Sequence, residues 1–312
     1  MRILLTGSTG FLGSNLLKAL SKLPHEVFCF KRDTKMREVK KFKPEIIYHC
    51  ACIACEGLSV FSPALITRNT FQNTIGILSP AINHKVRRFI YCSSMARYGK
   101  QRPPFTEDME PMPHDPYAIS KVSSEKMIKM MAETHGIEYV IAIPHNIIGP
   151  GQKYDDPFRN VASIMINRML QGKQPIIYGD GEQTRIFSFI DDCIGPLLRM
   201  LDCPSGEIYN IGPDNRDAAV VTINRLASTI AFLLSFNLKP IYMPERPREV
   251  REAYCSSDKI RKSFGYKTKT NLEDGLREMI KDIEKRGIKP FNYHLPIEIK
   301  DGCPKSWIDK LM

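Results

Sequence analysis

The chain has 312 residues, of which 43% are hydrophobic and 25% are charged, and its formal net charge is +11. This length provides one large or two modest domains, and no apolar run approaches the roughly 20 residues that span a bilayer. The opening MRILLTG is too short for a secretory signal, so the sequence predicts a globular cytoplasmic protein without a membrane partner.

The amino-terminal segment predicts a strand, a glycine turn and a helix. The apolar run 2–6 precedes the turn and the helix-period segment 14–23 follows it. In such a turn, glycines let the chain bend tightly and approach a pyrophosphate, which the N–H groups of the helix then bind. We therefore predict a dinucleotide cradle rather than a merely flexible turn, formed by Gly7, Gly10, Phe11, Leu12 and Gly13.

Short apolar runs alternate with helix-period segments through the first half of the chain. This pattern predicts an α/β fold, a Rossmann-type doubly wound parallel sheet over residues 1–146. From 147 to 312 the pattern loosens, which predicts a smaller, interleaved α/β substrate-binding domain with some segments that return to the first. The tail from Phe291 has no motif that we can interpret. Further predicted strands are 26–30, 45–50, 87–94 and 138–143, and predicted helices include 69–78, 118–136 and 160–172.

Basic residues follow the second predicted strand. Lys31 and Arg32 suit the 2′-phosphate of NADP, although Asp33 lies just beyond them. The patch KRDTKMREVKKFK lacks interleaved aromatic residues, so we read it as a solvated face and predict no nucleic-acid partner. Only 13 residues, 31–43, precede the next apolar run, which predicts that the sheet lacks a further strand here.

Three cysteines follow the third predicted strand in HCACIAC, namely Cys50, Cys52 and Cys55. Their spacing can occur at metal sites, but no second cysteine pair or histidine pair follows at zinc-ligand distance. We predict free thiols and no metal. Cys50 and Ala51 are instead small side chains at a strand end, where bulk would collide with a bound cofactor.

The segment YAISK puts Tyr117 and Lys121 four residues apart, on one helix face. Tyrosine has an ordinary pKa of about 10, and an adjacent ammonium favours its phenolate. The alternative is an exposed pair without function. Ser93 and Ser94 end an earlier predicted strand, where the ligand crevice of a parallel sheet opens, and their alternative role is to cap a turn.

These motifs together resemble the extended branch of the short-chain dehydrogenase/reductase superfamily, which contains nucleotide-sugar epimerases and dehydratases. The chain has the spacing G-x-x-G-x-x-G, the YxxxK pair, and an SSxxxYG pattern that aligns Ser94 with the catalytic hydroxyl. The resemblance implies Ser94, Tyr117 and Lys121 as catalytic residues. It also implies cofactor contacts from Tyr117, Lys121, Asn69 and Pro144, with NAD as the usual cofactor.

The same resemblance implies a nucleotide-sugar substrate, with a UDP-sugar favoured. Two arginines in QTRIF and RPREV match positions that bind diphosphate, a role that suits the forked guanidinium group. Each arginine alone would more often lie on the surface. The implied substrate-binding residues are Ser94, Asn146, Asn160, Val161, Tyr178, Arg185 and Arg246. A homodimer through helices of the first domain is also implied.

One departure from the family bears on the reaction. Dehydratases of this branch carry an Asp-Glu pair directly after the catalytic hydroxyl, whereas this chain has Met95 and Ala96. Neither side chain can exchange a proton, which argues against 4,6-dehydration. The sequence therefore predicts C4 epimerisation of a UDP-hexose. The alternatives are an NADP-dependent 4-keto-sugar reductase, or another sugar-nucleotide oxidoreductase, and a non-catalytic dinucleotide sensor.

Overall fold

A computed structural model describes residues 1–214, 216, 218 and 220–312. Its centre is a six-stranded sheet in the order β10-β5-β4-β3-β1-β2, in which every pair of neighbours is parallel. Apolar side chains that alternate along the strands face both sides of the sheet, so both faces must be covered. The strands are β1 (Arg2–Thr6), β2 (Glu26–Phe30), β3 (Ile46–His49), β4 (Arg88–Cys92), β5 (Glu138–Pro144) and β10 (Glu207–Ile211).

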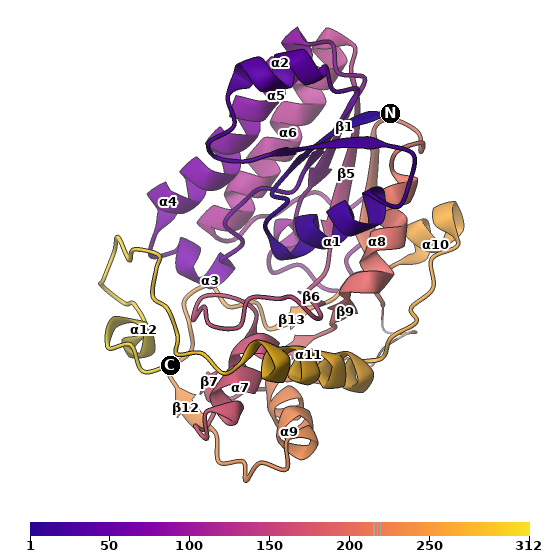
Figure 1. Ribbon diagram of the computed structural model, residues 1–312. Coiled ribbons are helices and arrows are strands. Elements are labelled where there is room, and N and C mark those ends of the chain that lie inside the picture. The colour runs from indigo at the N-terminus through magenta and orange to yellow at the C-terminus, as the bar shows by residue number, and fades with distance from the viewer. Residues whose placement is uncertain (215, 217, 219) are drawn as a thin grey trace.

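Helices cover the two faces of this sheet (Figure 1). On one face, α1 (Phe11–Leu20) and α8 (Ile190–Arg199) pack against Ile3 and Leu5. On the other face, α5 (Asn73–Asn83) and α6 (Pro116–His135) pack around Leu4. The predicted Rossmann-type doubly wound fold is therefore confirmed, with α2 (Met36–Phe42) and α10 (Asp258–Phe264) as further helices.

The strand order reverses between β1 and β3. The chain leaves β1 toward β2, at one edge of the sheet, and then returns to place β3 on the other side of β1. Ligands of open α/β sheets bind outside the carboxyl ends of the strands at such a switch point. Gly7 and Cys50 directly follow these two strands. Among the described residues β2 pairs with β1 alone, in agreement with the predicted lack of a further strand.

The predicted helices differ from the observed ones at their boundaries. Helix α6 (Pro116–His135) begins two residues before the predicted start at 118, and α7 (Val161–Leu170) is slightly shorter than the predicted 160–172. The other two differences are larger. Helix α1 begins at Phe11 rather than Ser14, so Gly13 lies inside the helix. The predicted helix 69–78 is part of one helical run, in which α4 (Pro63–Thr67) and α5 flank the π-helical turn η1 (Arg68–Gln72). Such π turns occur frequently at functional sites, and Asn69 lies in this one.

The second region lies below the large sheet in Figure 1 and has its own core. Helices α7 (Val161–Leu170), α9 (Ile223–Leu233) and α11 (Leu272–Arg286) pack together there, beside small sheets. We propose that the chain divides near residue 147, with β10, α8 and α10 returning to the first region. The short strands are β6 (Ile147–Ile148), β7 (Ile176–Tyr178), β8 (Thr184–Arg185), β9 (Ser188–Phe189), β11 (Val221–Thr222), β12 (Ile241–Met243) and β13 (Glu252–Ala253).

The tail after α11 joins the two regions. It is yellow in Figure 1, where it passes beside α3 (Glu56–Ser59) and forms the short helix α12 (Lys305–Ile308). Glu298 caps α4 by accepting hydrogen bonds from the backbone N–H groups of Ala64 and Leu65, both at 2.9 Å. Trp307 is 2% exposed and packs with residues of both regions. In the described part of the chain, no helix combines the length and apolarity needed to cross a bilayer.

Candidate active site

The glycine turn lies at the switch point and packs tightly against the loop after β3. Gly7 has φ +72°, and a Cβ atom there would lie 2.8 Å from the backbone nitrogen of Ala51. A Cβ atom on Gly13 would lie 2.2 Å from the carbonyl oxygen of Gly7. These two positions therefore require glycine for the turn itself. At Gly10 the nearest atom would lie 3.2 Å away, so that position is less constrained by the protein.

The start of α1 fits a dinucleotide phosphate. Gly10 is the N-cap residue, and no side chain caps the first turn, which includes Phe11, Leu12 and Gly13. A helix N-terminus of this kind combines N–H donors with a favourable dipole for anions. The opposing loop is held in place, because Ala51 donates a backbone hydrogen bond to Thr6 Oγ1 at 3.2 Å.

We expect two glycine substitutions to separate turn stability from ligand binding. Gly13→Ala should lower the melting temperature, because its Cβ atom meets backbone. Gly10→Val should fold but bind NAD roughly tenfold more weakly or worse, about 1.4 kcal/mol, since its side chain would enter the space beside the phosphate. Calorimetric titration with NAD and NADP measures both affinities. Unchanged affinity in folded Gly10→Val would remove the turn from the site.

Helix α6 carries the predicted catalytic pair. Asp115 caps it by accepting a hydrogen bond from the backbone N–H of Ala118 at 2.9 Å, and Pro116 occupies its first turn. The cap fixes where the helix begins, and both Tyr117 and Lys121 are buried. The Lys121 ammonium donates a 2.7 Å hydrogen bond to the carbonyl oxygen of Cys92. It lies 5.8 Å from the centre of the Tyr117 ring.

Ser94 joins this pair from the end of β4. Its hydroxyl accepts a hydrogen bond from the backbone N–H of Ala96 at 3.2 Å, so the capping role considered for it is real. It also bonds to the Tyr117 side chain. Burial raises the pKa of Tyr117 well above its ordinary value, whereas the Lys121 charge and the Ser94 hydrogen bond lower it. These two neighbours therefore favour the phenolate that a general base needs.

A second buried network supports the same helix one turn further on. Glu125 accepts a hydrogen bond from Ser93 and pairs with Arg97, whose nitrogen lies 3.1 Å from the carboxylate. Burial raises the pKa of Glu125, and the Arg97 charge opposes that rise. The network links α6 to the segment after β4, which carries Ser94. It therefore holds the two sides of the predicted catalytic cluster together.

The two predicted diphosphate ligands lie together in the second region. Glu249 bridges them, with its carboxylate oxygens 2.9 Å from Arg185 Nη2 and 2.5 Å from Arg246 Nη2. The Arg246 guanidinium also lies 4.9 Å from the centre of the Tyr178 ring. The arginines hold the pKa of Glu249 below its ordinary value despite burial. The structure thus brings Tyr178, Arg185 and Arg246 into one cluster around a carboxylate.

Other predicted substrate residues have structural partners. Asn146 has φ +32° and donates a hydrogen bond to the carbonyl oxygen of Ile186 at 3.0 Å. Asn160 caps α7 by accepting from Ala162 N–H at 2.9 Å, and Val161 is the first residue of that helix. Their predicted contacts with substrate therefore stay predictions.

The remaining predicted cofactor residues lie around the carboxyl edge of the sheet. Lys31 and Arg32 follow β2 and are exposed, and Pro144 ends β5. The side-chain amide of Asn69 donates a 2.8 Å hydrogen bond to the carbonyl oxygen of Leu65. The Cys50 and Cys92 sulfurs lie 3.4 Å apart at the ends of β3 and β4. The described residues contain no group of three or more His, Cys, Asp or Glu able to hold a metal ion.

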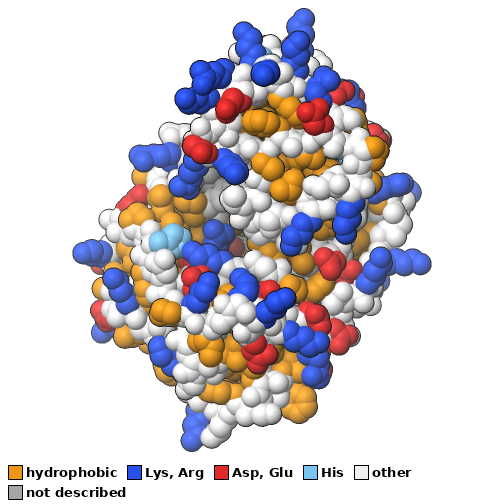
Figure 2. All heavy atoms as spheres, in the orientation of Figure 1, with side chains coloured by type: hydrophobic (Ala, Val, Ile, Leu, Met, Phe, Trp, Pro, Cys, Tyr) orange, Lys and Arg blue, Asp and Glu red, His pale blue; other side chains and the backbone are white. Residues whose placement is uncertain are grey.

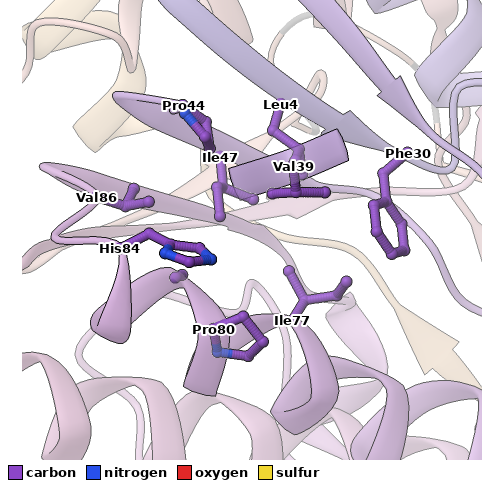
Figure 3. Close-up of a pocket in the computed structure, with 10 residues that line it drawn as sticks. Leu4, Phe30, Val39, Pro44, Ile47, Ile77, Pro80, His84 and Val86 are labelled. Atoms are coloured by element: carbon purple, nitrogen blue, oxygen red, sulfur yellow. The ribbon is translucent and has the colours of Figure 1, made fainter. Parts of the chain in front are cut away.

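The recess on the face drawn in Figure 2 lies between the upper and lower halves of the molecule, and Lys and Arg side chains border it. The cavity in Figure 3 is a different feature. Leu4, Val39 and Ile77 line it between the sheet and helices α2 and α5, and its volume is about 10 Å³. That is room for roughly one water molecule. It cannot hold a cofactor.

Three residues near the site were not predicted. Glu56 begins α3 and has no local sequence signal, whereas Glu249, which bridges the arginines, has one local signal, its position three residues after Arg246. Trp307 lies in the uninterpreted tail, where it meets the Tyr178 ring at a centroid distance of 6.3 Å. Its neighbour Ser306 is bonded to the Tyr178 hydroxyl at 2.6 Å. The only sequence signal for this contact is that the single tryptophan of the chain lies in the tail, which weakly indicates that the tail packs against the rest of the protein.

The glycine cradle at the switch point, with a Tyr-Lys pair and a serine beside it, defines an NAD-dependent enzyme of the extended short-chain dehydrogenase/reductase type. The family model described as NAD dependent epimerase/dehydratase family matches residues 3–212. The chain belongs to this family, and the resemblance inferred from the motifs is confirmed at that level.

Relatives with nearly the same sequence identity to this chain are named for different reactions. A putative UDP-glucose 4-epimerase of Methanocaldococcus jannaschii is 29% identical over 304 residues, covering 89% of this chain and 97% of the relative. The GDP-6-deoxy-D-mannose reductase of Pseudomonas aeruginosa is 28% identical over 306 residues, covering 91% and 98%. The crystal structure of UDP-glucose 4-epimerase with UDP-glucose from Thermotoga maritima has a TM-score of 0.82 at 27% identity, covering 92% and 99%.

Proposed function

We propose that the protein is a nucleotide-sugar epimerase that inverts C4 of a UDP-hexose through a 4-keto intermediate. The observation that carries this proposal is the convergence of Ser94, Tyr117 and Lys121 beside the glycine cradle. The proposal is also supported by the relatives that are named as UDP-glucose 4-epimerases. A non-catalytic sensor would need the cradle but not a buried proton relay.

In this mechanism Tyr117 takes the proton from the sugar hydroxyl, and Ser94 shares it through their hydrogen bond. Lys121 favours the phenolate by its positive charge and would hold the ribose of a bound cofactor. A nicotinamide cofactor, when bound, supplies reversible hydride transfer at the reacting carbon. After the keto sugar turns over, Tyr117 returns the proton to the opposite stereoisomer. We propose that Arg185 and Arg246 bind the diphosphate, with Tyr178, Asn146, Asn160 and Val161 as further substrate contacts.

The residues after Ser94 favour epimerisation over dehydration. Neither Met95 nor Ala96 has an ionisable side chain, and Met95 is also buried, so neither can move a proton to or from C5 or C6 of the sugar. A net 4-keto-sugar reductase remains the second candidate, because the same three residues serve it and one relative is named as a reductase. We further propose NAD rather than NADP as the cofactor, a homodimer, and a cytoplasmic location.

The decisive assay has two arms: one incubates the protein with NAD and a panel of UDP-, GDP-, CDP- and dTDP-sugars, and the other supplies NADH or NADPH and 4-keto derivatives of the same sugar nucleotides. We expect chromatography to detect the C4 epimer of a UDP-hexose without a net change in nicotinamide absorbance. Stoichiometric loss of reduced nicotinamide with a 4-keto substrate would instead establish the reductase. A protein that binds the dinucleotide and converts no sugar nucleotide would be the sensor.

A further inference from the structure

Glu56 lies between the two parts of the proposed site. It is the first residue of α3, whose Ser59 donates a 3.1 Å hydrogen bond to Asp115, two residues before Tyr117. On its other side, a Cβ atom added to Gly57 would lie 3.2 Å from Arg246 Nη1. A nucleotide sugar that reaches from the diphosphate arginines to Tyr117 must pass this helix.

The Glu56 side chain is accessible to solvent, although several largely buried charged groups lie near it. It is exposed, although its helix neighbours Leu58 and Ser59 are buried. The four charged groups that act on it are mostly buried themselves: Asp115, Arg185, Glu249 and Arg246. The protein groups packed around the Glu56 carboxylate desolvate it, although part of the side chain stays accessible to solvent, and this raises its pKa to about 7; the Asp115 charge adds to that rise. An exposed carboxylate in such surroundings lines a crevice rather than the outer surface.

The nearby cations are already engaged. Arg185 and Arg246 both pair with Glu249, and within the described residues no lysine or arginine nitrogen lies within 4.0 Å of the Glu56 carboxylate. A bound diphosphate would engage the arginines further. Glu56 therefore remains a hydrogen-bond acceptor without a cation of its own, directed at whatever occupies the crevice.

We propose that Glu56 contacts the sugar ring and makes the site selective for neutral hexoses over hexuronates, an inference that rests on the proposed nucleotide-sugar function. Sugar hydroxyls donate hydrogen bonds, which a carboxylate accepts. A uronate carboxylate brings a second negative charge into a partly desolvated site, and like charges placed together discriminate strongly against the wrong ligand. A hexose and a hexuronate differ at C6, where the hexose has a neutral hydroxymethyl group and the uronate has a carboxylate.

The experiment compares UDP-glucose with UDP-glucuronate at pH 8, where Glu56 is ionised. We expect the wild type to prefer UDP-glucose at least tenfold in kcat/KM and in calorimetric affinity. Glu56→Gln removes the charge and keeps the shape, so the preference should fall about tenfold through better use of the uronate. Glu45→Gln makes the same change of charge at the opposite, amino-terminal edge of β3 and should leave the preference unchanged.

The pH dependence gives an independent readout. As pH falls below about 7, Glu56 takes up a proton, so the wild-type preference should decrease while that of Glu56→Gln stays flat. Selective binding of UDP-glucose without turnover would support the role of Glu56 in sugar selectivity and would overturn the proposed epimerase activity. Equal affinity for both ligands in the wild type, or an unchanged preference in Glu56→Gln, would overturn the role of Glu56 alone. Binding of neither would overturn both.

Discussion

Tyr117→Phe should leave NAD affinity within about twofold of the wild type while turnover falls by roughly 10²- to 10⁴-fold, the usual contribution of a positioned general base. Phenylalanine keeps the buried ring and its packing between Lys121 and the core. It deletes the one hydroxyl that the proposed mechanism uses to take the sugar proton. Single-turnover kinetics with the converted UDP-hexose, together with calorimetric titration of NAD, would measure the two effects separately.

Tyr91→Phe provides the matched control. The Lys121 ammonium also lies over the Tyr91 ring, 4.9 Å from its centre. This variant therefore removes a neighbouring hydroxyl and retains the cation–π contact, and we expect it to keep most of its turnover. Equal rates for the wild type and Tyr117→Phe would refute the proposed proton transfer, whatever sugar is converted.

The pKa of Tyr117 sets the direction of a further effect on the pH profile. Burial raises this pKa, and the Lys121 charge is the largest opposing influence. Activity should rise with pH as the phenolate forms. Removal of the Lys121 charge moves the phenolate pKa upward, so the rising limb of the profile moves to higher pH. A purely structural role for Lys121 would lower the rate without moving this limb.

Local sequence signals predicted the first region well, because the physics that shapes it is local. The apolar run of β1, the glycines of the turn and the period of α1 lie within 20 consecutive residues. Tyr117 and Lys121 share a helix face through their spacing of four alone. Even the missed start of α6 had a local signal, since Asp115 followed by Pro116 is a typical cap and first helical residue.

Long-range electrostatics explains what the sequence could not predict. Glu249 is recognisable as the partner of Arg246, three residues away, but its bond to Arg185 joins residues 64 positions apart. Glu56, in α3, is influenced by the charges of the same cluster, although it lies more than 100 positions earlier in the chain. Asn160 illustrates the converse, because its helix-capping bond is local and its predicted substrate contact is not. Pairings of this kind depend on how the two regions pack.

The tail is the largest element without a sequence interpretation, and we expect Trp307→Ala to destabilise the protein by about 3–5 kcal/mol, the usual range for a large aromatic residue removed from a core. The indole packs against Phe158 at a centroid distance of 5.2 Å and against Phe61 at 6.1 Å. These neighbours belong to the second and first regions, so the cavity would open where the regions meet. Urea unfolding, followed by circular dichroism, would measure the loss.

Two further variants determine how the tail acts. Trp307→Phe retains most of the buried apolar area and should lose less than half as much stability. Ser306→Ala removes the 2.6 Å hydrogen bond to Tyr178 and should cost about 1 kcal/mol. A loss below about 1 kcal/mol in Trp307→Ala would mean that the tail docks loosely and that the two regions hold together without it. With the expected loss, the tail holds the two regions together beside the site, because its indole contacts Phe61, Phe158 and Tyr178.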